Sequence, residues 1–166
     1  LLDIPHGRHQ HKRPVPRIGG IGLFVGFISI ALLIYNFAPF ENPADGQRIG
    51  GVLLGCSFVF IFGLIDDWKE LSAGPQFAVQ ITAALIASFT TVFIERFTNP
   101  ITNELVMLPF WLVLPITIFW VVGMMNTVNW LDGLDGLAAG VGAIAALLFA
   151  VHMHSLGQPK VALYAL

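Results

Sequence analysis

The segment NTVNWLDGLDGLAAG, residues 126–140, places amide and carboxylate side chains at regular intervals directly before an apolar run. The four groups stand three residues apart: Asn126, Asn129, Asp132 and Asp135. On a straight helix each step of three residues turns the side chain by about 60° around the axis, so the four would spread instead of stacking. One of the acids could cap the helix that follows, but a single cap does not account for all four groups. Their number favours a binding or catalytic role.

A second acidic group follows an apolar run in GLIDDWKELSAGPQF, where Asp66 and Asp67 are adjacent. Neighbouring carboxylates repel each other unless a cation or a proton intervenes. Their hard oxygen atoms suit Mg²⁺, which typically takes one or two protein carboxylates together with substrate phosphates. The alternative is a pair of solvated residues at a helix end, although acidic groups at a helix C-terminus oppose the macrodipole. With the acids of residues 126–135, the pair predicts a metal and phosphate site beside a lipid-accessible surface.

The third polar stretch is DIPHGRHQHKRPVPRIGG, residues 3–20. A dense cationic loop within it contains Arg8, His9, His11, Lys12, Arg13 and Arg17. Guanidinium forks and lysine point charges are suited to clamping phosphate, and the helix start expected after Gly19 and Gly20 also favours anions. The alternative is a basic anchor that holds this loop on the cytoplasmic side of a membrane.

The rest of the chain must position these three stretches, and its composition indicates a membrane. Hydrophobic residues make up 56% of the 166 residues and charged residues only 11%, with a mean hydropathy of +0.79. Such values lie outside the range of ordinary soluble domains. Helices buried in soluble proteins also keep a polar face, which these apolar runs lack.

Five apolar runs are close to the roughly 20 residues that a helix needs to cross a bilayer. A sixth run begins near Val161 and is cut off by the end of the chain, so we expect an incomplete protein. The sequence thus predicts an all-α, polytopic transmembrane bundle in a single integral membrane domain, with a kink at the prolines of the fourth run. The five runs are 18–38, 49–65, 77–94, 105–125 and 134–153.

The distribution of basic residues predicts the orientation, because cytoplasmic loops retain Lys and Arg. If residues 1–17 are inside, then residues 66–76 and 126–133 are inside as well. This set holds five of the eight basic residues: Arg8, Lys12, Arg13, Arg17 and Lys69. We therefore expect a cytoplasmic basic loop at 1–17 and cytoplasmic active-site loops at 66–76 and 126–133.

The three stretches resemble those of the polyprenyl-phosphate N-acetylhexosamine-1-phosphate transferases, integral membrane enzymes that begin cell-envelope glycan synthesis. The pattern D-x-P-x-x-R-x-x-H-x-x-P-x-P-R-x-G-G is matched from Asp3, and G-x-x-D-D is matched from Gly63. The pattern N-x-x-N-x-x-D-G-x-D-G-L-A is matched from Asn126. Two departures are Gln76, where many relatives have Lys, and His9, where many have a second basic residue.

The resemblance implies transfer of a sugar 1-phosphate from a UDP-sugar to undecaprenyl phosphate, with release of UMP and a requirement for Mg²⁺ (or Mn²⁺). It implies that the catalytic residues are Asp66, Asp67, Asp132 and Asp135. Substrate would be bound by Arg8, His11, Lys12, Arg17, Asn126 and Asn129. The metal ligands implied are Asp66, Asp67 and Asn129.

Within the family, VPRIGG at residues 15–20 favours the branch that uses UDP-GlcNAc, because phospho-MurNAc-pentapeptide transferases typically carry TPTMGG at this point. The expected location is the bacterial plasma membrane, with several spans and an active site that faces the cytoplasm. No feature suggests a nucleic-acid partner, and assembly into a homo-oligomer stays open. The family's later cytoplasmic segments would lie beyond Leu166.

Two other classes of function compete with this interpretation. A cation-coupled transporter would also use acids near the membrane, and a non-catalytic membrane scaffold needs no site at all. A carrier is expected to place ionisable groups near the middle of its spans, and the five runs carry none there. This absence favours chemistry at the membrane surface.

Overall fold

A computed structural model gives the fold of the 166-residue chain. The structure describes all residues except 1, 4–14, 17–18, 38–39, 41, 134–135 and 166, and it describes only the backbone of residues 2–3 and 15–16. The described chain forms two compact units. The central unit is Ala44–Asn126, and the terminal unit joins Leu1–Pro43 to Thr127–Leu166. The prediction of one membrane domain concerns their arrangement and stays a prediction.

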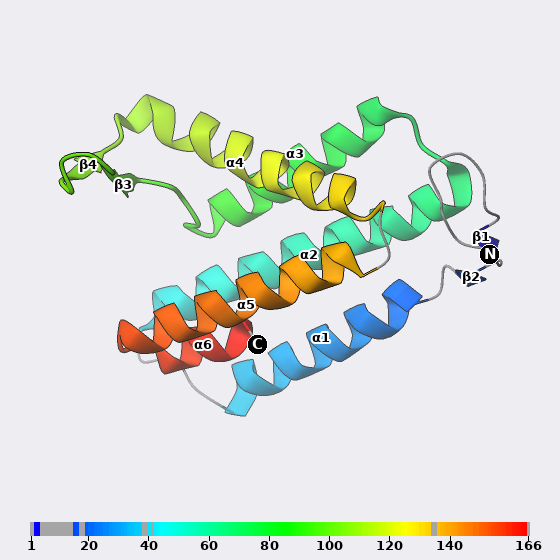
Figure 1. Ribbon diagram of the computed structural model, residues 1–166, viewed down its shortest axis with the longest axis horizontal. Coiled ribbons are helices and arrows are strands. Elements are labelled where there is room, and N and C mark those ends of the chain that lie inside the picture. Colours follow the sequence, from blue (N-terminus) through cyan, green and yellow to red (C-terminus); the bar gives the residue numbers. More distant parts are fainter. Residues whose placement is uncertain are drawn as a thin grey trace. The chain divides into compact units, whose positions relative to one another are not determined.

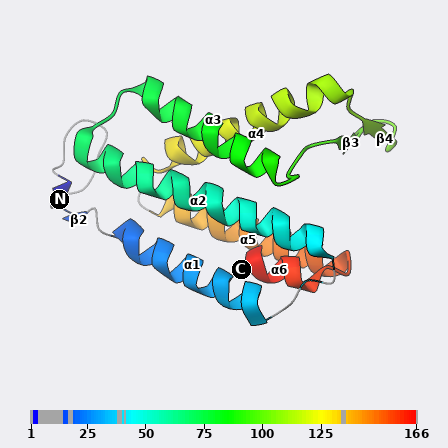
Figure 2. The ribbon, with the colours of Figure 1, turned by 180° about the vertical axis from the view of Figure 1, so that it is seen from behind.

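The central unit is an arrangement of helices with one small hairpin between the last two (Figure 1). In chain order its elements are α2 (Pro43–Lys69), α3 (Ala73–Phe89), β3 (Arg96–Thr98), β4 (Leu105–Met107) and most of α4 (Phe110–Leu131). The last turn of α4, from Thr127, belongs to the terminal unit. Strands β3 and β4 pair antiparallel, with Arg96 opposite Met107. The turn between α2 and α3 lies at one end of this unit and the hairpin at the other, so α3 connects the two ends (Figures 1 and 2).

The terminal unit contains α1 (Gly19–Phe37), α5 (Leu137–Ser155) and α6 (Pro159–Ala165), and a two-residue strand pair precedes them. Strands β1 (Leu2–Asp3) and β2 (Val15–Pro16) are antiparallel. Helix α6 folds back along α5, as both views of the ribbon show (Figures 1 and 2). Gly157 permits this reversal because its φ of 72° lies in the left-handed region, which glycine adopts without strain.

Four described helices are long and apolar enough to cross a membrane, which confirms the all-α polytopic fold. They are α1, α2, α4 and α5, and the apolar helix α3 is shorter, at 17 residues. Their large side chains face outward: Leu23 is 79% exposed and Phe110 is 95% exposed. Outward apolar side chains are expected where lipid, and not water, surrounds a helix.

The third and fourth predicted spans have the wrong boundaries. Hydropathy predicts that the third run reaches residue 94, but α3 ends at Phe89, and Thr91 then adopts a φ of 65°. It predicts a fourth run from residue 105, but Leu105–Met107 forms strand β4 and α4 begins at Phe110. Hydropathy cannot separate these segments, because apolar residues in a hairpin score like those in a helix. Pro115 does lie inside α4, and the kink stays a prediction.

Small residues bring α2 and α3 close together. Gly51 and Gly55 of α2 are buried, as are Ala83 and Ala84 of α3. A Cβ atom at Gly51 would overlap the side chain of Thr90, and one at Gly55 would lie 3.5 Å from the carbonyl oxygen of Ala83. Small residues of this kind allow membrane helices to approach each other closely.

A buried threonine of α4 holds the segment between α3 and the hairpin. Thr117 is only 2% exposed, and its Oγ1 atom accepts a hydrogen bond from the backbone N–H of Ile94 at 3.0 Å. The same hydroxyl donates to the carbonyl oxygen of Val113 at 2.7 Å. The segment that leads into β3 is therefore attached to α4 by a buried hydrogen bond.

Candidate active site

The acidic pair lies in the last turn of α2, not in a loop. We define the acidic corner as Asp66, Asp67 and the turn Glu70–Ser72 that joins α2 to α3. The expected loop at 66–76 is therefore wrong in extent, because α2 continues to Lys69 and α3 begins at Ala73. Lys69 in the last turn favours this extension, since a basic side chain complements the helix dipole there.

The turn itself is tight. The backbone N–H of Glu70 donates to the carbonyl oxygen of Asp66 at 2.7 Å, which completes the last turn of α2. Glu70 has a φ of 48°, in the left-handed region that commonly ends helices. The chain then turns through Leu71 and begins α3 after Ser72.

The carboxylate of Asp66 is held by donors from beyond this turn. Its Oδ1 atom accepts a hydrogen bond from the backbone N–H of Leu71 at 2.8 Å. The Nε2 atom of Gln76, in the first turns of α3, lies 3.2 Å from Oδ1 and 3.1 Å from Oδ2. The same nitrogen donates to the carbonyl oxygen of Leu71 at 3.2 Å. Asp66 is thus bonded to the backbone of the turn and to the following helix by neutral donors.

One turn further along α3, a pair of amides connects α3 to α4. The Nδ2 atom of Asn126 donates to the Oε1 atom of Gln80 at 2.6 Å, and Gln80 Nε2 lies 3.5 Å from Asn126 Oδ1. Asn126 also donates to the carbonyl oxygen of Val122 at 2.8 Å. Because Gln76 and Gln80 are four residues apart, they lie on the same face of α3. Helix α3 thereby brings the first residue of the 126–135 motif near the acidic corner.

The rest of that motif is only partly described. Asn126 and Asn129 both belong to the final turns of α4, so the expected loop at 126–133 is wrong for residues 126–131. The helix continues because asparagine is tolerated there and no glycine or proline interrupts it before Gly133. Asn129 and Asp132 are exposed and belong to the terminal unit, and Asp135 lies outside the described residues.

The basic loop also falls outside the described residues. This applies to Arg8, His11, Lys12 and Arg17, so their roles in substrate binding stay predictions. The backbone of β1 and β2, which precede and follow residues 4–14 in the sequence, pairs Asp3 with Val15.

The described residues do not by themselves complete a metal centre. Among them, no group of three or more His, Cys, Asp or Glu side chains is placed to hold a metal ion. The acidic corner nevertheless offers the hard oxygen donors that Mg²⁺ prefers, and Mg²⁺ commonly needs only one or two protein carboxylates. The donor chemistry of Asp66 and Asp67 therefore fits this ion.

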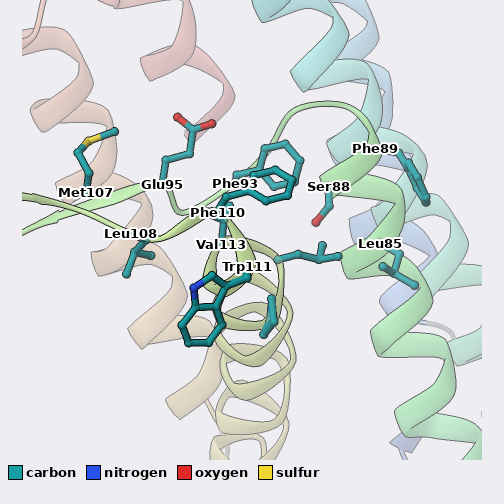
Figure 3. A pocket seen from close by; sticks show the side chains of 12 residues that line it. Leu85, Ser88, Phe89, Phe93, Glu95, Met107, Leu108, Phe110, Trp111 and Val113 are labelled. Atoms are coloured by element: carbon teal, nitrogen blue, oxygen red, sulfur yellow. The ribbon is translucent and has the colours of Figure 1, made fainter.

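A large cavity lies at the opposite end of α3 from the acidic corner. It has a volume of about 730 Å³ and is formed by the end of α3, the hairpin and the start of α4 (Figure 3). Its walls are mostly apolar, with Phe93, Phe110 and Trp111 among the lining side chains and Glu95 as a charged one. The 17 residues of α3 span about 25 Å at about 1.5 Å per residue, so this cavity is remote from the acids.

The sequence alone assigns no role to Gln76 or Gln80, although both make contacts between elements. A signal is present, because two amides four residues apart stand at the start of an apolar helix. Amides in such a helix are expected to find partners, since an unsatisfied amide in an apolar environment is costly. The identity of those partners cannot be read from the pattern.

Comparisons with known proteins cover most of this chain. The model of glycosyl transferase family 4 matches residues 49–166. A probable undecaprenyl-phosphate N-acetylglucosaminyl 1-phosphate transferase of Bacillus subtilis is 32% identical over 157 residues, covering 95% of this chain and 42% of the relative. A decaprenyl-phosphate N-acetylglucosaminephosphotransferase of Mycobacterium tuberculosis is 33% identical over 158 residues, covering 94% of this chain and 39% of the relative.

Relatives named as phospho-N-acetylmuramoyl-pentapeptide-transferases also match this chain. A phospho-N-acetylmuramoyl-pentapeptide-transferase of Desulforudis audaxviator is 33% identical over 165 residues, covering 87% of this chain and 48% of the relative. The chain spans less than half the length of these relatives. No solved structure matches it significantly. Since the family match extends from α2 to α6 and includes both the acidic corner and the amide pair, the chain belongs to glycosyl transferase family 4.

Proposed function

We propose that the protein containing this chain transfers N-acetylglucosamine 1-phosphate from UDP-GlcNAc to undecaprenyl phosphate in the plasma membrane, with its active site on the cytoplasmic face. In the net reaction an oxygen of the lipid phosphate forms a bond with the phosphorus that carries the sugar. The bond from that phosphorus to the bridging oxygen breaks, and UMP leaves with the electron pair. The lipid is left with a sugar diphosphate that later enzymes can extend.

One observation carries this proposal: polar side chains from two separate motifs bond to neighbouring turns at the same end of α3. Asp66 contacts Gln76, and Gln80 contacts Asn126 one turn further along the same helix. A lipid phosphate resides at the membrane surface and a nucleotide sugar arrives from water, so the two substrates can meet only at such an end. The family relatives named for polyprenyl-phosphate substrates support the assignment.

The acidic corner would hold Mg²⁺ (or Mn²⁺) through carboxylate oxygen atoms of Asp66 and Asp67, together with phosphate oxygens of the donor. The bound cation would neutralise charge on the diphosphate, which is a major requirement of phosphoryl transfer. Asn129, Asp132 and Asp135 are proposed to contact the diphosphate or the nucleotide. The cationic side chains Arg8, His11, Lys12 and Arg17 are proposed to hold phosphate.

The described helices argue against a cation-coupled carrier. Carriers place ionisable groups within their spans, at the depth where the cation is bound. In the described helices, Asp, Glu, Lys and Arg occur only in the first two and last two turns of α2 and in the first turn of α6.

The test is transfer by the full protein in membranes, with radiolabelled UDP-GlcNAc, undecaprenyl phosphate and Mg²⁺. We expect a lipid-linked product, and we expect Asp67→Asn to lower its rate by at least about 100-fold, as loss of electrostatic stabilisation at a reacting centre typically does. Glu104→Gln is the matched control, because it also removes an acidic charge but lies in the exposed hairpin turn.

The choice of donor is tested in parallel with UDP-MurNAc-pentapeptide. The proposal requires product from UDP-GlcNAc and little from the peptide-bearing donor. Product from only the latter would assign the protein to the other branch, and the absence of product from both would contradict the transferase function.

A further inference from the structure

We infer that the cavity at the hairpin end of α3 is a binding site for a membrane phospholipid. The lipid inserts one acyl chain between α3 and α4 and places an ammonium head group beside Glu95. This site is separate from the acidic corner, and the inference does not depend on the proposed transfer reaction. It gives the central unit a second ligand, which comes from the leaflet on the hairpin side of the membrane.

The wall of the cavity is suited to hydrocarbon. Its volume of about 730 Å³ lies within the range of about 300–1,000 Å³ that is usual for sites that bind small molecules. The hydroxyl of Ser88, one of its few polar groups, already donates to the carbonyl oxygen of Ala84 at 2.9 Å. The N–H of Leu108 donates to the carbonyl oxygen of Glu95 at 2.8 Å. Apolar cavities hold water poorly and bind apolar ligands instead.

The cavity lies where α4 enters the membrane. Helix α4 is long and apolar enough to cross a bilayer, and it begins at Phe110. The lining residue Trp111 is 71% exposed, and exposed tryptophans are enriched at the level of the lipid head groups. Leu114, which also lines the cavity, lies about 4–5 Å further into the span at about 1.5 Å per residue. Head groups are therefore expected beside Trp111 and acyl chains beside Leu114.

The cavity is continuous with the lipid-facing surface of the central unit. Phe89 of α3 and Phe110 of α4 both line it, and they are 83% and 95% exposed. Leu85 and Val113, which line it from the same two helices, are half-buried. An acyl chain can therefore enter between the two helices directly from the bilayer, and it gains dispersion contacts with the half-buried side chains.

The charge at the cavity favours one class of phospholipid. Of the described residues that line it, Glu95 alone is charged. Glu95 is exposed, and its carboxylate lies at the edge of the group of lining side chains (Figure 3). The next residue, Arg96, does not line the cavity, because successive side chains of an extended segment point to opposite sides. A carboxylate attracts an ammonium group and repels an anionic one, so phosphatidylethanolamine should bind more tightly than phosphatidylglycerol.

The test is lipid binding by the full protein, purified in detergent and freed of most of its own lipid. Phosphatidylethanolamine and phosphatidylglycerol with identical acyl chains are added separately, and native mass spectrometry counts the bound lipid at each concentration. The thermal midpoint of the same samples provides a second measurement, because a ligand that binds only the folded state raises it.

Two pairs of variants separate the cavity from the rest of the lipid-facing surface. Leu114→Trp fills the cavity. Met124→Trp is its control, because Met124 has a similar exposure on the same helix, 48% against 40%, but does not line the cavity. Glu95→Gln removes the charge of the cavity. Glu104→Gln is its control, because it removes an acidic charge from the hairpin turn, outside the cavity.

We expect Leu114→Trp to weaken the binding of both lipids by about 10-fold or more relative to Met124→Trp. Each buried methylene group contributes a factor of about four to the affinity, and the indole ring should displace about two of them. Glu95→Gln should reduce the preference for phosphatidylethanolamine by about 2-fold to 5-fold, the usual effect of an exposed ion pair. Glu104→Gln should keep the wild-type preference.

Equal lipid binding by Leu114→Trp and Met124→Trp would overturn the inference, because another segment of the full protein would then cover the cavity. A wild-type preference for phosphatidylglycerol would also overturn it. If Leu114→Trp does not fold, the second pair decides: an unchanged lipid preference in Glu95→Gln contradicts the site. Neither measurement uses a UDP-sugar or Mg²⁺, so failure of this inference and failure of the proposed function are seen separately.

Discussion

At the scale of single residues, the structure changes how the polar groups of this chain are understood. Asn126 belongs to a motif that predicts substrate binding, yet its amide bonds to Gln80 and to the carbonyl oxygen of Val122. Its Oδ1 atom makes a longer contact of 3.5 Å with Gln80. The structure therefore gives Asn126 a role in joining α3 to α4, and its contact with substrate stays a prediction.

We predict that Asn126→Leu and Gln80→Leu each destabilise the protein, because each leaves an amide without a partner in a half-buried position. The cost of each should be about 1–2 kcal/mol, and the double variant should cost less than the sum of the two. Hydrogen bonds between membrane helices contribute about 0.6 kcal/mol on average and up to about 1.7 kcal/mol. Unfolding in mixed detergent of the wild type, the two single variants and the double variant measures the coupling free energy between Gln80 and Asn126. If the costs of the two single variants simply add in the double variant, the amide pair contributes nothing.

A buried hydroxyl provides a second prediction. Thr117→Val keeps the shape of the side chain but removes the acceptor for the Ile94 N–H. A buried donor without an acceptor typically costs about 1–3 kcal/mol, so we expect a lower thermal midpoint. We also expect faster hydrogen exchange at Ile94, with little change at the acidic corner. Wild-type exchange at Ile94 in this variant would contradict the role assigned to Thr117.

At the scale of elements, the packing of α2 on α3 depends on residues without large side chains. Gly51 is buried against Thr90, whereas the neighbouring Gly50 has open space where a Cβ atom would lie. Both glycines belong to the same helix, so substitution by alanine has the same favourable effect on helix propensity at each position. The difference between the two variants therefore isolates the contact between helices.

We predict that Gly51→Ala is destabilising by about 1–3 kcal/mol, the usual cost of overpacking, because its Cβ atom would overlap Thr90. Gly50→Ala should be neutral or stabilising. Thermal midpoints of the two variants in one detergent provide the comparison. Equal midpoints would mean that α2 and α3 do not approach each other as closely as the structure shows.

The element boundaries show what the sequence can and cannot predict. Hydropathy locates the membrane helices because their apolar runs are long, and it places the polar motifs at or near helix ends. It misjudges the extent of α2 and α4, because Asp66, Asp67 and Asn126 are polar enough to suggest loops although helical turns tolerate them. It also counts Leu105–Met107 as part of a membrane span, since local composition does not reveal strand pairing.

The candidate site is also predictable only in part from the sequence. The acidic pair and Asn126 stand out because charged and amide groups are rare in an apolar chain. Their partners Gln76 and Gln80 do not, because the contact of Asp66 with Gln76 depends on the turn at Glu70 and the contact with Asn126 depends on how α3 lies against α4. These contacts depend on how helices that are distant in the sequence pack together, and the hydrophobic periodicity of each helix does not predict that packing.

At the scale of the whole molecule, the proposed orientation places the acidic corner in the cytoplasm and the β3–β4 hairpin outside. The two lie at opposite ends of the central unit (Figure 2). Positive charge in the 1–17 segment supports this assignment through the positive-inside rule.

The orientation can be tested with single cysteines, since Cys56 is the only natural one in this sequence. In a Cys56→Ser background, Thr102→Cys should react with a membrane-impermeant maleimide added outside intact cells, because Thr102 lies in the exposed turn of the hairpin. Ser72→Cys should react only after the membrane is opened. The reverse pattern would place the acidic corner outside, where UDP-sugars are absent.

The close contact at Gly51 has a consequence for the distant acidic pair. Gly51 lies 15 positions before Asp66 in one continuous helix, a separation of about 22 Å at about 1.5 Å per residue. If a substitution at Gly51 tilted this rigid helix by about 3° at that point, the carboxylates would be displaced by about 1 Å. If the protein has the proposed transferase activity, substitutions at Gly51 should therefore change its rate as well as its stability.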